Sequence, residues 1–74
     1  MKLPEPFKDS DGTWHYKIAP NFEIFIEKTG GYGKFIPRAQ RWTISILGPV
    51  YICQCLPTRK ACIAAIPRLL RAMP

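Results

Sequence analysis

The chain has 74 residues, enough for one domain with a small core, and its length excludes a multidomain protein. Three cysteines cannot all pair with one another, which argues against a secreted disulfide scaffold and favours a reducing, cytoplasmic setting. Charge is divided unevenly: residues 1–28 hold all five acids and four lysines, a net charge of −1, whereas residues 29–74 hold seven cations and no acid, a net charge of +7. A field of one sign attracts polyanions or acidic protein surfaces.

The N-terminal part predicts an arm followed by two strands. Residues 1–8 are rich in proline and predict an extended arm, and residues 9–12 (Asp-Ser-Asp-Gly) predict a turn. Residues 14–18 predict a short strand, which Pro20 ends. Residues 22–28 predict a second strand, because large apolar side chains alternate with two glutamates and a phenylalanine.

The middle of the chain predicts a hairpin. A glycine-rich turn follows residue 28, and residues 34–36 are candidates to pair back before Pro37 stops the ladder. Residues 42–46 alternate between large apolar side chains and Thr or Ser, which is typical of a half-buried strand. Residues 50–55 are short and β-branched enough to form its partner strand.

The C-terminal part predicts an amphipathic helix. Thr58 is a suitable N-cap, and apolar residues then recur at spacings of 4, 3 and 4: Cys62, Ile66, Leu69 and Met73. Pro67 predicts a kink or a second short helix, because it lacks an amide donor and clashes with the preceding turn. We therefore expect a single α+β domain over 1–74, with an antiparallel meander of three or four strands and a Pro-kinked helix packed on one sheet face.

No catalytic constellation is evident. His15 is the only histidine, and a Cys–His pair would depend on a coincidence of folding. Glu23 and Glu27 share a strand face but stand about 13 Å apart along it, so we expect them to be solvated rather than paired for acid–base work. We predict a half-buried strand histidine, no enzymatic activity, no cofactor and no small-molecule substrate.

Three patterns suggest a metal or phosphate site, but each departs from the motif that it suggests. Cys53, Cys55 and Cys62, with His15, include good zinc ligands, but their spacing is not that of a zinc knuckle. We predict small core hydrophobes instead, because free cysteine is among the most buried residue types. A calcium loop starting at residue 9 would need an acid where Pro20 stands. The glycine-rich turn lacks the Gly-Lys-Ser/Thr ending of a phosphate loop.

Cations interleaved with aromatic residues are the best functional feature. They suit nucleic-acid backbones and exposed bases, and an acidic protein patch as well. No RNP motif, helix-turn-helix or finger spacing is present to read bases. The candidate partner-binding residues are Tyr32, Lys34, Arg38, Arg41, Arg59, Lys60, Arg68 and Arg71.

The segment 42–73 resembles the layout of AP2-like and phage integrase arm-binding domains. In that layout a strand beginning with Trp leads to a second strand and then to a helix that starts at a Thr, here residues 42–46, 51–53 and 58–61. The resemblance implies the architecture only. Pro67 and the lack of acidic helix positions depart from that pattern.

The leading hypothesis is a non-enzymatic basic module that contacts nucleic acid, or a nucleoprotein site that normally holds nucleic acid. The alternative is a protein–protein inhibitor or regulator, of the kind bacteriophages make as accessory proteins, that blocks an acidic partner surface. A third reading is a basic amphipathic helix lying on a membrane. A membrane partner is disfavoured, because the helix is needed to cover the sheet. The uncharged stretch 42–58 is also short and interrupted by Gly48-Pro49.

Overall fold

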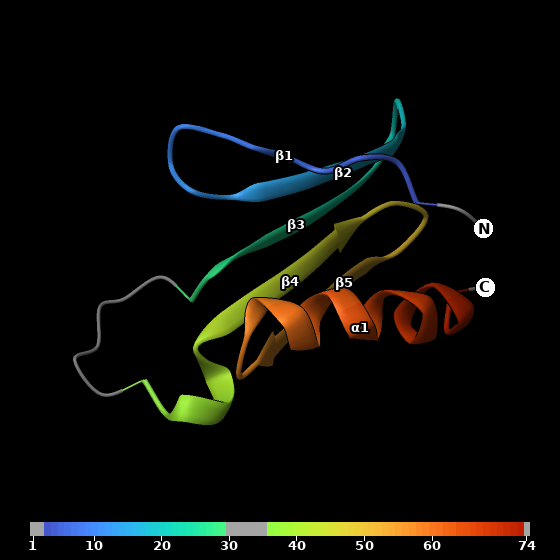
Figure 1. The fold of residues 1–74 in the computed structure, drawn as a ribbon. Coiled ribbons are helices and arrows are strands. Elements are labelled where there is room, and N and C mark those ends of the chain that lie inside the picture. Colours follow the sequence, from blue (N-terminus) through green and yellow to red (C-terminus); the bar gives the residue numbers. More distant parts are fainter. Residues whose placement is uncertain (1–2, 30–35, 74) are drawn as a thin grey trace.

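One antiparallel sheet of five strands forms the frame of the molecule in the computed structural model, which describes residues 3–29 and 36–73 (Figure 1). The strands stand in the sheet in chain order, so each strand pairs with its neighbours in sequence. A single long helix follows them and lies against one sheet face. The elements are β1 (Phe7–Lys8), β2 (Trp14–Ala19), β3 (Phe22–Lys28), the short 3-10 helix η1 (Arg38–Gln40), β4 (Trp42–Leu47), β5 (Tyr51–Leu56) and α1 (Arg59–Arg71).

The α+β class is confirmed, and the expected strand count is corrected from three or four to five. The additional strand is β1, at the end of the expected extended arm, where Phe7 pairs with His15 and Lys8 pairs with Trp14. A strand of two residues cannot show the alternation that reveals a longer strand, because alternation needs at least four positions.

The register gathers the large apolar side chains of β2, β3 and β4 on one sheet face. Tyr16, Ile24 and Ile46 lie in one cross-strand row. Ile26 and Ile44 form part of the next row. All five are 0–6% exposed, so they form the core between the sheet and the helix. Neighbouring residues along each strand point to the opposite face, as the sequence predicts for β3 and β4.

Helix α1 begins at a capped end and buries three of the four residues of the predicted stripe, while Met73, the fourth, follows the helix and is half-buried. The Thr58 side chain accepts a hydrogen bond from the Ala61 amide at 3.0 Å, as expected of an N-cap. Cys62, Ile66 and Leu69 are buried against β3, β4 and β5. The helix runs as one element from Arg59 to Arg71 with Pro67 inside it, not as two short helices. A kink at Pro67 stays a prediction.

The turn after β1 forms as predicted. Asp9 Oδ1 accepts hydrogen bonds from the amides of Asp11 (2.8 Å) and Thr13 (3.0 Å). Gly12 adopts a φ of +87°, a backbone conformation that a residue with a Cβ rarely adopts. These contacts bring the Asp9 carboxylate beside β2.

The connection between β3 and β4 is described only in part. Lys34 and Phe35, from the segment expected to pair back, lie outside the described residues. From Ile36 the chain leads into η1, and the Thr29 amide donates to the Arg41 carbonyl at 2.8 Å, which closes the base of the connection. Within residues 3–29 and 36–73, no helix has the length and apolar character needed to cross a membrane.

Candidate binding surfaces

The sheet face opposite α1 carries a row of aromatic and polar side chains. Cross-strand pairing places Phe7, His15, Phe25, Ser45 and Cys53 in line from β1 to β5. We call this side the open face, because the helix packs against the other side of the sheet. It corresponds to the polar positions of the strand patterns.

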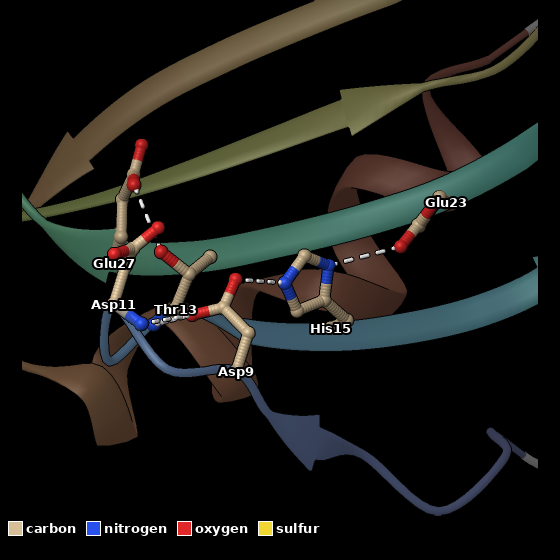
Figure 2. Close-up of polar contacts among 6 residues, drawn as sticks. All are labelled: Asp9, Asp11, Thr13, His15, Glu23 and Glu27. Carbon is tan, nitrogen blue, oxygen red and sulfur yellow. Dashed lines mark hydrogen bonds and ion pairs between the residues drawn. The ribbon is translucent and has the colours of Figure 1, made fainter.

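His15 lies between two carboxylates on the open face (Figure 2). Its Nε2 is 2.6 Å from Asp9 Oδ2, and its Nδ1 is 2.9 Å from Glu23 Oε1. A neutral imidazole carries one N–H and donates to one carboxylate, whereas the imidazolium donates to both. The arrangement therefore fits the charged ring. The contact between His15 and Glu23 corrects the expectation that Glu23 is a solvated acid. Glu27 accepts a hydrogen bond from Thr13 Oγ1 at 3.1 Å.

The carboxylates shift the titration of the histidine. The hydrogen bond that His15 donates to Asp9 raises the pKa of His15 above its usual value. Partial burial opposes this shift, and the hydrogen bond to Glu23 adds to it. The same contact with His15 lowers the pKa of Asp9, and the Thr13 amide lowers it further. Each partner thus stabilises the charged form of the other.

His15 does not reach a thiol. Cys53 lies in the same cross-strand row but three strands away, about 14 Å at ordinary strand spacing. Cys62 lies on the other side of the sheet, in the core. Both ring nitrogens of His15 are already bound to carboxylates, so the histidine is not placed to activate any of the three cysteines.

The cysteines separate into two exposed thiols and one buried thiol. Cys53 and Cys55 are exposed on the open face, which corrects their expected place in the core, while Cys62 is fully buried as expected. Thr43 Oγ1 lies 3.6 Å from Cys55 Sγ, and Ser45 Oγ lies 3.7 Å from Cys53 Sγ. Among the residues that the structure describes, no three His, Cys, Asp or Glu side chains are grouped to hold a metal ion.

The predicted partner-binding residues do not form one contiguous set. Tyr32 and Lys34 lie outside the described residues. Arg59 stacks over the Trp14 ring, 4.4 Å from its centre, on the β2 side of the helix. Arg68 reaches the β5 side, where its Nη2 lies 3.5 Å from Gln54 Oε1.

Four other predicted cations are exposed to solvent. Lys60 and Arg71 share the outer face of α1, because eleven residues of helix return to nearly the same side. Arg38 and Arg41 are exposed in and next to η1, which packs against β5. Over residues 3–29 and 36–73, no lysine or arginine makes an ion pair, since the two ion pairs found there both belong to His15.

A pocket of about 380 Å³ lies beside Trp14. Its lining includes Trp42 and Lys28, and also Asp11 and Glu27. Cations and acids line it together, so its charge favours no particular class of ligand.

Two surface features were not predicted from the sequence. Leu47 and Tyr51 are 44% and 65% exposed and pair across the β4–β5 hairpin, next to Val50, which is 38% exposed. Strand β5 also ends the sheet, so its outer backbone edge faces no strand among the described residues. Strand alternation does show which residues share a face, but it does not show which strand stands at the edge.

Comparison with models of protein families, with curated proteins and with solved structures gives no match for this chain. The likeness to AP2-like and integrase arm-binding domains therefore remains one of layout.

Proposed function

We propose that this protein is a small basic module that binds nucleic acid through its phosphate backbone, or docks at a nucleoprotein site that normally holds nucleic acid, without catalysing a reaction. One observation carries the proposal: the exposed cations of the second half of the chain are left without ion pairs in the described structure, whereas two acids are engaged by His15. An uncompensated positive field binds phosphates and releases their counterions.

The spacing of the two cations on the outer face of α1 is compatible with contacts to several phosphates. Lys60 and Arg71 are eleven residues apart on one helix side, about 16 Å at 1.5 Å per residue. That span corresponds to about five nucleotides of one strand of duplex DNA at 3.4 Å each. Arg38 and Arg41 add two further exposed charges at the η1 end. We propose these four as phosphate contacts.

The open face is a poor alternative for this contact. Its described cations are Lys17 and His15, and the histidine is held by Asp9 and Glu23. Glu27 adds a further negative charge on the same side. Phosphates would be repelled there, so the helix side is the proposed surface.

Salt titration tests the proposal. The protein should bind a fluorescent 20-nucleotide single strand or duplex, with log K falling linearly as log salt rises. Arg38→Glu with Arg41→Glu, and separately Lys60→Glu with Arg71→Glu, should each weaken binding and reduce the slope by about two contacts. Lys17→Glu is the control, since Lys17 is exposed on the open face, and its effect is compared per reversed charge with that of each double variant. The proposal would be overturned if the affinity did not change with salt concentration, or if all three folded variants lost affinity equally for each charge reversed.

A further inference from the structure

Strand β5 presents an open edge. It pairs with β4 on one side over all six residues, from Tyr51 to Leu56, and no strand among residues 3–29 and 36–73 pairs with its other side. In an antiparallel ladder, alternate residues direct their amide and carbonyl groups outward, so about half of the backbone groups of β5 face away from β4. Such groups are a template for another extended chain.

The sequence of β5 lacks the features that usually block such pairing. Strand β5 contains no charged residue, no proline and no interruption of its register with β4. The opposite edge of the sheet differs: β1 has only two residues, one of which is Lys8, and prolines at 4 and 6 precede it. The β5 edge therefore offers the longer unpaired stretch of strand, about 20 Å, although η1 also packs against this strand.

The two sides of β5 differ in character. On the helix side Arg68 extends from α1 to Gln54, and no acid follows Glu27 in the chain to neutralise it. On the open side Cys53 and Tyr51 carry no charge, and Tyr51 is 65% exposed. A strand added at this edge would place alternate side chains beside the arginine and beside the uncharged residues.

We propose that the β5 edge binds an extended, acidic segment of a partner protein by strand addition. The segment alternates Asp or Glu, facing Arg68, with apolar residues, facing the Cys53 and Tyr51 side. Main-chain hydrogen bonds supply affinity, and the alternation supplies specificity. The inference is independent of the phosphate contacts proposed for Lys60, Arg71 and the η1 arginines.

Charge favours an acidic partner over a second copy of this chain. Each copy carries a net charge of +6. Antiparallel pairing of two β5 strands centred on Gln54 would also bring Arg68 close to its counterpart in the other copy. Like charges placed opposite each other destabilise an interface, so charge disfavours self-pairing.

Peptide binding tests the proposal. The probe is a fluorescent eight-residue peptide of alternating Glu and Val, measured by anisotropy at physiological salt. Its controls are a Lys–Val peptide, a Glu-Glu-Val-Val peptide of the same composition, and the Glu–Val peptide with alternate backbone nitrogens methylated to remove donors. The unmodified Glu–Val peptide should bind at least tenfold more tightly than each control. Equal binding of the methylated or block-patterned peptide would show attraction by charge alone and overturn strand addition.

Two charge-reversal variants distinguish binding at the β5 edge from general attraction by the positive charge of the protein. Arg68→Glu should weaken Glu–Val peptide binding at least tenfold, while Arg71→Glu, the same charge change on the outer helix face, should alter it less than threefold. Circular dichroism confirms that both variants fold. Equal effects of the two variants would overturn the proposal, as would self-association of the free protein through β5. Full competition by an oligonucleotide that depends on Arg68 would assign the edge to nucleic acid and also overturn it.

Discussion

The ring of Phe7 stacks on the imidazole of His15, with ring centres 4.8 Å apart and planes inclined by 7°. Phe25 meets the same imidazole edge-on at 4.9 Å. Asp9, two residues after Phe7, binds the ring through Nε2. Strand β1 pairs with β2 over only two residues, so much of its attachment to the sheet depends on His15.

This attachment makes stability depend on pH. The pKa of His15 is raised in the folded state, so its contribution is complete below the usual value near 6.5 and is lost as pH rises through the folded pKa. The pKa of Asp9 is lowered, so its contribution is present above its usual value near 3.8 and is lost as pH falls through the folded pKa. Both contributions are complete between these two usual values. Urea unfolding should therefore have a higher midpoint at pH 5.5 than at pH 8.

His15→Gln is the matched variant for this effect. Glutamine keeps polar contacts but does not titrate, so the difference between pH 5.5 and pH 8 should largely disappear. Amide exchange of Phe7 and Lys8 in the wild-type protein should speed up over the same pH interval beyond its intrinsic pH dependence. A variant that keeps the full pH difference would show that another group is responsible.

The sheet core was predictable because burial imposes alternation. Ile44 and Ile46 face the helix while Ser45 faces away, and a slip of one residue in the pairing with β3 would turn both isoleucines to the open face. Cys53 and Cys55 were misplaced for a related reason. Their strand also alternates, and the helix covers only one face of the sheet. The average burial of cysteine does not indicate on which face a given thiol lies.

The contacts of His15 with Asp9 and Glu23 could be predicted only in part from the strand pattern. Alternation does place His15 and Glu23 on one face, a signal that could have suggested their contact. The Asp9 contact depends on the turn that folds the arm back beside β2. Arg59 and Arg68 were likewise predicted to be exposed cations, and neighbouring elements direct them to opposite sides of the helix.

Thiol exposure predicts two fast reactions and one slow reaction. Cys53 and Cys55 should react with an aromatic disulfide reagent in the native protein. Burial raises the pKa of the Cys62 thiol and removes it from solvent, so it should react on the order of 100-fold more slowly or slower, only through opening. Cys53→Ser with Cys55→Ser should remove the fast phase entirely. Three thiols reacting at similar rates in the folded wild type would contradict the buried position of Cys62.

The cap of α1 predicts a graded loss of stability. Thr58→Ala removes the acceptor for the Ala61 amide and should lower the free energy of unfolding by about 1 kcal/mol. Thr58→Ser keeps an acceptor oxygen and should stay close to wild type. Urea titration of the three proteins at one pH measures the difference. If alanine and serine variants are equally stable, the side chain does not cap the helix in solution.

The packing of helix on sheet is tested at Ile66, which is 0% exposed at the centre of the buried stripe. Ile66→Ala should cost about 2–5 kcal/mol, because a cavity remains between α1 and the sheet. Leu70→Ala, at a half-buried position one turn further along, should cost less. Ile66→Asp should abolish cooperative unfolding, because an unpaired carboxylate would be buried. An Ile66→Asp protein that melts cooperatively at the wild-type temperature would mean that α1 does not cover the sheet through this residue.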